Sequence, residues 1–115
     1  MNWYIAKIVF QININQGEHA LQFDESLRLI QADSLTSAYH HAFRIGESEE
    51  SIFLNNRKEK VEWKFIDVAD IYHIENLEHG AELHSNTYID YHPDKYITHV
   101  KLRALTIRES TIVLS

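Results

Sequence analysis

Two runs of alternating apolar and polar residues open the chain, at Trp3–Ile14 and Leu21–Ala32. A period of two is typical of strands that are buried on one face. The first run carries apolar residues on both sides at its start, which indicates a strand in the interior of a sheet. The polar segment Asn15–His19 between the runs is typical of a turn. The pattern predicts two consecutive strands.

A helical period replaces the alternation after Asp33-Ser34. Five apolar residues recur at helical spacing: Leu35, Ala38, Tyr39, Ala42 and Ile45. A short side-chain oxygen before this stripe can accept from the first free amides of a helix. Gly46 can take the left-handed conformation that closes one. The pattern predicts a helix over about 35–45 that covers one face of the sheet, with Thr36, His40 and Arg44 outward. The acidic segment Glu47–Glu50 is expected to be a solvated loop.

A long strand is predicted over Lys60–Ile74, preceded by a short strand at Ser51–Leu54 with which it forms a hairpin. Val61, Trp63 and Phe65 share one face of the long strand. From Ile66 the apolar set continues as Ile66, Val68 and Tyr72 on what had been the polar face. Such a switch predicts a bulge or a change of partner near Ile66-Asp67.

The last thirty residues carry two competing patterns. Pro93-Asp94 resembles a helix start, and Ile97, Val100, Ala104 and Ile107 have helical spacing, although Tyr96–Ala104 also alternates as a strand would. We favour a helix over about 93–105 and a terminal strand at Thr111–Leu114, with a short extended piece at Ala81–Ser85. The expected fold is therefore α+β: a mainly antiparallel sheet packed against one clear helix at about 35–45, with a second helix near 93–105.

Composition indicates one globular domain over residues 1–115. The chain is 44% hydrophobic, with 3 glycines and 1 proline, so it has enough apolar surface to offset the entropy of ordering. It has no cysteine, which excludes disulfides and thiolate chemistry. Neither a basic leader followed by an apolar core nor a run of about 20 apolar residues is present, so we expect a cytoplasmic protein that does not enter a membrane.

Charge argues against nucleic acid as a partner. Eleven Lys and Arg against seventeen Asp and Glu leave a net charge of -6, which repels phosphate. The one basic cluster, Arg57, Lys58 and Lys60, is interrupted by Glu59. The same acidity would suit a basic protein partner.

Neither a metal site nor a catalytic site follows from the candidate residues. Imidazole is a common metal ligand, but the histidines match no zinc spacing: His73, His79, His84, His92 and His99, with Asp90 and Asp94 nearby. The serines lack a nucleophile-elbow pattern, and Ser34 is better explained as a cap. Asp67 and Asp70, three apart on a strand, should face opposite sides. The three glycines are too scattered to cradle a phosphate. No cofactor is expected.

Three blocks resemble a family of small bacterial domains of unknown function. They are Trp3–Lys7, Glu25–Ser34 continuing through Ala38, Ala42 and Gly46, and Val61–Tyr72 ending near Gly80 and Glu82-Leu83. The resemblance implies an α+β core over residues 3–85 and says nothing about catalysis. Residues 86–115 form an extension, which we expect to pack on the core or on a second subunit. Glu25 and Arg28 of the second block are either a polar anchor for a ligand or structural residues, as an ion pair within the sheet or facing solvent. Trp63 is a core or interface aromatic, and these three are the candidate binding residues.

A non-enzymatic interaction module that self-associates, as a dimer, is the favoured function. A long strand with apolar residues on both faces, in a chain with few helices to cover them, commonly leaves an interface. Two alternatives remain. One is an immunity- or antitoxin-like inhibitor of a basic enzyme, suggested by small size and the acidic Glu47–Glu50 segment. The other is a small metal-dependent hydrolase that uses histidine and aspartate residues of the C-terminal half.

Overall fold

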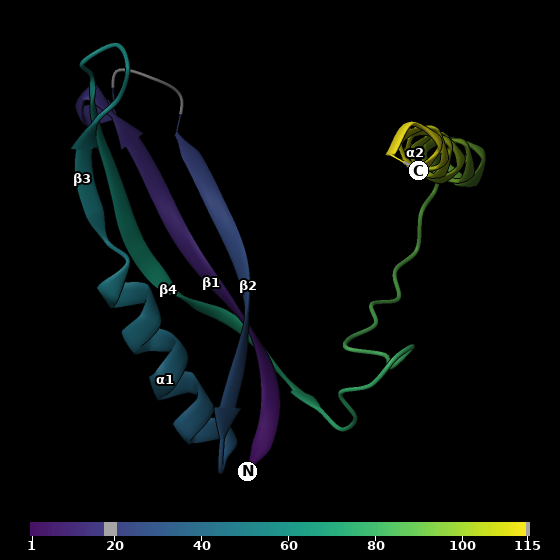
Figure 1. The fold of residues 1–115 in the computed structure, drawn as a ribbon, viewed down its shortest axis with the longest axis horizontal. Helices are drawn as coiled ribbons and strands as arrows, with labels where there is room; N and C mark the ends of the chain where they lie inside the picture. The colour runs from purple at the N-terminus through teal and green to yellow at the C-terminus, as the bar shows by residue number, and fades with distance from the viewer. Residues whose placement is uncertain (18–20, 115) are drawn as a thin grey trace. The chain divides into compact units, whose positions relative to one another are not determined.

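The computed structural model describes residues 1–17 and 21–114, and of residues 111–114 only the backbone. Residues 1–85 and 86–115 form two compact units, which we describe separately. The first unit contains four antiparallel strands in the spatial order β2-β1-β4-β3. Figure 1 shows these strands side by side, with one helix beside them. The bounds are β1 Asn2–Ile14, β2 Gln22–Ala32, α1 Leu35–Ser48, β3 Ser51–Leu54 and β4 Lys60–Ile74, with a 3-10 turn at Asn15–Gly17 between β1 and β2.

The α+β fold expected from the sequence is confirmed. β1 lies in the interior of the sheet, as its two apolar faces predict, and β3 and β4 form the expected hairpin. The predicted turn at Asn15–His19 is described only as far as Gly17, and its last two residues lie outside the described part of the chain.

Helix α1 begins as predicted and ends later than predicted. The Ser34 hydroxyl accepts a hydrogen bond from the Ser37 amide at 3.1 Å, which is an N-cap. The prediction that Gly46 closes the helix is wrong, because Gly46 is buried inside it and the C-cap is Glu49. The acidic segment Glu47–Glu50 is exposed to solvent, as predicted, but it is not a loop throughout. Its first two residues complete the helix, and the carboxylate of Glu50 accepts from the Phe65 amide at 3.0 Å.

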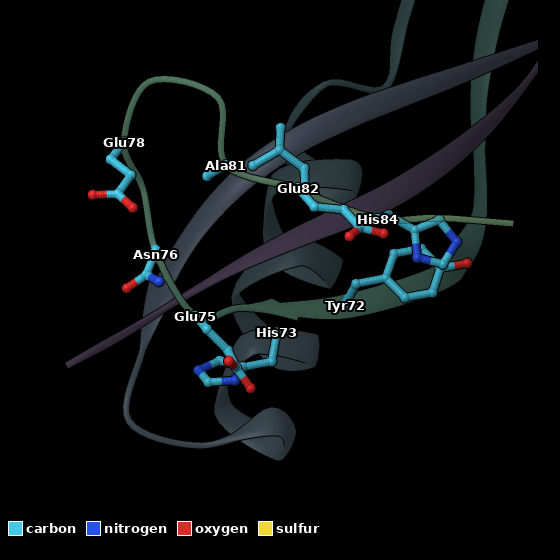
Figure 2. Close-up of a pocket in the computed structure, with 9 residues that line it drawn as sticks. Tyr72, His73, Glu75, Asn76, Glu78, Ala81, Glu82 and His84 are labelled. Atoms are coloured by element: carbon cyan, nitrogen blue, oxygen red, sulfur yellow. The ribbon is translucent and has the colours of Figure 1, made fainter.

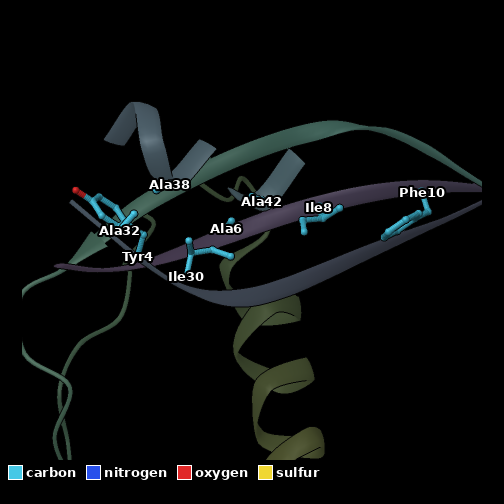
Figure 3. Packing of buried hydrophobic residues seen from close by; sticks show 8 residues of the cluster. All are labelled: Tyr4, Ala6, Ile8, Phe10, Ile30, Ala32, Ala38 and Ala42. Atoms are coloured by element: carbon cyan, nitrogen blue, oxygen red, sulfur yellow. The ribbon is translucent and has the colours of Figure 1, made fainter. Parts of the chain in front are cut away.

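The core lies between α1 and one face of the sheet (Figure 3). Its fully buried members alternate along β1 and meet small residues of the helix, which lets the helix approach closely: Tyr4, Ala6, Ile8, Phe10, Ile30, Ala32, Ala38 and Ala42. Trp63 and Phe65 pack against this cluster from β4, with ring centroids 5.9 and 6.0 Å from that of Phe10. Thr36, His40 and Arg44 point away from the core and are exposed, as predicted.

Two bulges interrupt β4 where it pairs with β1. Phe65 pairs with Phe10 and Asp67 with Val9, so Ile66 is the extra residue, which confirms the predicted irregularity near Ile66-Asp67. A second extra residue, Ala69, follows at once. The prediction that Val68 continues on the polar face is wrong, because the first bulge returns it to the helix-covered face, where it packs against the core.

The second unit contains one long helix, α2 (Pro93–Leu114). It begins at Pro93 as predicted. It continues to Leu114, so the strand expected at Thr111–Leu114 is wrong. Within the described chain Ala81–Ser85 is also not a strand. The aromatic rings of Tyr88 and Tyr96 meet edge to face at 5.9 Å.

Candidate interaction surface

The face of the sheet that points away from α1 is here called the open face. Its residues are the odd-numbered positions of β1, the residues paired with them on β2 and β4, and Ile52 and Leu54 of β3. Within the described part of residues 1–85, the one α-helix packs on the opposite face. Several open-face positions nonetheless carry apolar side chains: Trp3, Ile5, Val9, Phe23, Leu27, Leu29 and Tyr72.

Exposed apolar side chains of the open face lie on both edge strands, and on β3 Ile52 is 61% exposed and Leu54 is 67% exposed. Phe23 and Leu27 are each 60% exposed and Leu29 is 50% exposed. On β1, in the middle of the sheet, Ile5 and Val9 are half-buried by their neighbours. Three large apolar side chains on one face of β2, with the exposed Glu25 between Phe23 and Leu27, form a patch of the kind that marks interaction surfaces.

An ion pair lies among these apolar residues. The Lys7 ammonium is 3.6 Å from the Asp70 carboxylate, and the two residues are directly paired across β1 and β4. Because the charges neutralise each other within one molecule, this part of the open face can approach another apolar surface at lower electrostatic cost than a lone charge would allow. Burial raises the pKa of the neighbouring Tyr72 phenol, and the Asp70 charge adds to this.

Glu25 and Arg28, two of the residues singled out from the sequence, lie on opposite faces of β2. Glu25 pairs with Val9 on the open face, whereas Arg28 pairs with Ala6 on the helix-covered face. The Arg28 guanidinium forms a bidentate ion pair with the carboxylate of Glu49, at the end of α1. Its Nε also donates to the hydroxyl of Ser26 on β2 at 2.8 Å. The guanidinium lowers the pKa of Glu49. Arg28 is therefore a structural link between strand and helix, and Glu25 remains an exposed residue of the open face.

Trp63, the third residue, lies on the helix-covered face. It pairs with Ile12, is half-buried and packs beside Phe10. The structure places Trp63 on the other side of the sheet from Glu25, so the three candidate residues do not form one site.

A cleft of about 510 Å³ lies beside the end of β4 (Figure 2). The ring of His84 stacks on that of Tyr72 with centroids 3.5 Å apart, which fixes the chain after β4 against the open-face side of that strand. The carboxylates of Glu75, Glu78 and Glu82 line the same cleft. Among the described residues no group of three or more His, Asp or Glu side chains is arranged to hold a metal ion.

A second groove, of about 430 Å³, runs between α1 and β4. Leu35, Val68 and Ile71 line it, together with Tyr39, whose hydroxyl donates to the Asp67 carboxylate at 2.7 Å. This bond raises the pKa of the Tyr39 phenol. Since Asp67 is bound to Tyr39 and Asp70 to Lys7, the two carboxylates have separate structural partners.

Sequence reasoning missed the apolar row on β2. Phe23, Leu27 and Leu29 occupy alternate positions opposite the buried Ile30 and Ala32, and this alternation was available in the sequence. What could not be read was that β2 lies at the edge of the sheet, which leaves these side chains exposed.

Comparison with known proteins gives one family match. A family model described as "Domain of unknown function (DUF4288)" matches residues 3–85, which is most of the chain and agrees with the first compact unit. The chain therefore belongs to this family. No curated protein and no solved structure matches it. No helix in the described chain is both long and apolar enough to cross a membrane.

Proposed function

We propose that this member of the family is a non-enzymatic interaction module that associates with a second copy of itself through the surface around the open face and β2. The observation that carries the proposal is the row of exposed apolar side chains Phe23, Leu27 and Leu29 on the side of the sheet away from α1. Exposed apolar patches of this kind are favourable to bury, at about 25 cal/mol for each Å² removed from water.

Light scattering of the full chain at micromolar concentration tests the proposal. We expect a dimer, and we expect Leu29→Lys to raise its dissociation constant at least tenfold, because a charge would be buried in the apolar part of the interface. Leu35→Lys is the matched control, since Leu35 is 57% exposed but lies on α1. A wild-type chain that is strictly monomeric and binds no partner in pull-downs would overturn the proposal. Equal changes of the dissociation constant in the two variants would also overturn it.

The acidic Glu47–Glu50 segment lends no further support to an inhibitor of a basic enzyme. Glu49 is bound to Arg28, and Glu50 accepts from the Phe65 amide. Both carboxylates thus stabilise the contact of α1 with the sheet, and we do not base a second function on them.

A further inference from the structure

The outer edge of β2 is long and has few features that would block pairing. β2 ends the strand order and pairs with β1 without a register shift along its eleven residues, whereas the opposite edge strand, β3, has four residues. Natural edge strands are commonly shortened, bulged, or protected by lysine or proline. β2 contains neither lysine nor proline, and its charged residues, Asp24, Glu25 and Arg28, are of both signs and can pair across the edge. Its free backbone amides and carbonyls can therefore accept another strand.

We infer that the second copy adds to this edge, with the two β2 strands antiparallel and Ser26 facing Ser26 at a two-fold axis, so that one sheet of eight strands spans the dimer. This inference rests on the proposed function and specifies its geometry. Residues directly opposite each other in a sheet point to the same face. A two-fold axis between antiparallel strands must therefore pass between two copies of the same residue, and only a few registers are available.

The Ser26 register brings complementary side chains together on both faces. On the helix-covered face Arg28 lies opposite Asp24 of the second copy, twice by symmetry. On the open face Leu29 lies opposite Phe23 of the second copy, again twice, and Leu27 lies opposite the exposed Glu25. Opposite charges and apolar pairs at directly facing positions each stabilise a sheet. The register thus covers part of the exposed apolar side chains of β2.

Neighbouring registers are less favourable. An axis at Asp24, Glu25 or Arg28 places two like charges directly opposite each other, which destabilises pairing. An axis at Leu27 sets Asp24 opposite the buried apolar Ile30, and leaves the carboxylate without a charged partner. Of these registers, the one at Ser26 brings no like charges together and also gives Asp24 a charged partner, Arg28.

Arg28 can bind Asp24 of the second copy while it keeps its ion pair with Glu49. Nε donates to the Ser26 hydroxyl, and Nη1 and Nη2 donate to the two Glu49 oxygens. A guanidinium has five N–H donors, so these three bonds leave capacity for Asp24 of the second copy. The Asp24 charge already acts on Arg28 within one chain.

Single-cysteine cross-linking tests the register, because the chain has no native cysteine. Directly opposed strand residues have Cα atoms about 4.5–5.5 Å apart, within the range that a disulfide spans. We expect full-length Ser26→Cys to form a disulfide dimer under mild oxidation at least tenfold faster than Ser51→Cys, the matched change on edge strand β3. Equal rates in a protein that light scattering shows to be dimeric would overturn the β2 register while leaving the proposed self-association intact.

A charge comparison provides the second test. Asp24→Arg and Glu25→Arg change the net charge equally, but only Asp24 faces Arg28 in the inferred dimer. We expect Asp24→Arg to weaken the dimer about tenfold more than Glu25→Arg, measured as the dissociation constant by light scattering. Equal weakening would contradict the register. A wild type that is monomeric throughout would overturn both this inference and the proposed function.

Discussion

The ring of Phe65 lies directly against the backbone of Gly46, where the sheet meets the last turns of α1. A Cβ atom on residue 46 would stand 2.3 Å from Cε1 of that ring, closer than van der Waals contact allows. The ring cannot easily move aside, because it meets Phe43 edge to face at 4.9 Å and Phe10 at 6.0 Å. Glycine is required here for close approach and not for a helix end.

Gly46→Ala is therefore expected to destabilise the protein. Alanine favours a helix interior by about 1 kcal/mol over glycine, but overpacking costs about 1–3 kcal/mol, so the clash outweighs the gain. Denaturant unfolding should show a net loss. In a Phe65→Leu background, which removes the ring, the same change should cost less. A gain in stability in the wild-type background would show that the ring yields to the methyl group.

The Arg28–Glu49 pair should make stability depend on pH. The guanidinium lowers the pKa of Glu49 in the folded chain, so its contribution is present above the unfolded pKa of about 4.3 and is lost as pH falls through the folded pKa. The side chains are 34% and 42% exposed, so solvent screening limits the contribution to about 0.5–1 kcal/mol at pH 7.

Urea unfolding of Glu49→Gln at several pH values measures this contribution. We expect the variant to be less stable than the wild type at pH 7 and equally stable in acid below the folded pKa of Glu49. Glu47→Gln, on the same turn of α1, should show a smaller difference. A deficit of Glu49→Gln that stays constant with pH would contradict the ion-pair account.

The loss of stability on truncating a core side chain should increase with the burial of that side chain. Phe10 is 2% exposed, so Phe10→Ala should cost about 3–5 kcal/mol, as large aromatic truncations in cores do. Trp63 packs beside it but is only half-buried, so we expect Trp63→Ala to cost less, about 2 kcal/mol, and still more than a surface change. Thermal or denaturant unfolding gives the order. A cost below about 1 kcal/mol for Trp63→Ala would show that the indole contributes little to the core.

Helix α2 should depend on its apolar stripe, which consists of Tyr96, Ile97, Val100, Ala104 and Ile107. Most of the stability of helices in proteins comes from the packing of an apolar face, so α2 should be more stable when another surface covers the stripe. Val100→Asp should lower the helix signal in circular dichroism and speed trypsin cleavage after Lys101 and Arg103. Leu102→Asp, an exposed leucine on the other side of the helix, is the control. Equal effects of the two changes would show that the stripe has no covering partner.

Local patterns were sufficient to predict the positions of most elements. Strand periods, the Ser34 cap and the hairpin before β4 depend on residues close together in the chain, and each was predicted from the sequence. The first bulge could also be predicted, because a change of the apolar face within one strand indicates an irregularity within a few residues of the change. The helix that begins at Pro93 was favoured for the same local reason. Its C-terminal end was predicted wrongly, because α2 continues to Leu114 where a strand was expected.

What the sequence by itself determined is thus a set of strands and helices with their apolar faces. The tertiary structure decided which surfaces meet. It placed Phe65 over Gly46, so that the helix continued past the glycine, and it brought Glu49 to Arg28, which separated Arg28 from Glu25. It also put β2 at the edge of the sheet, leaving Leu27 and Leu29 exposed. These outcomes depend on strand order and on which face the helix covers, and residues far apart in the chain set both, so no local period can encode them.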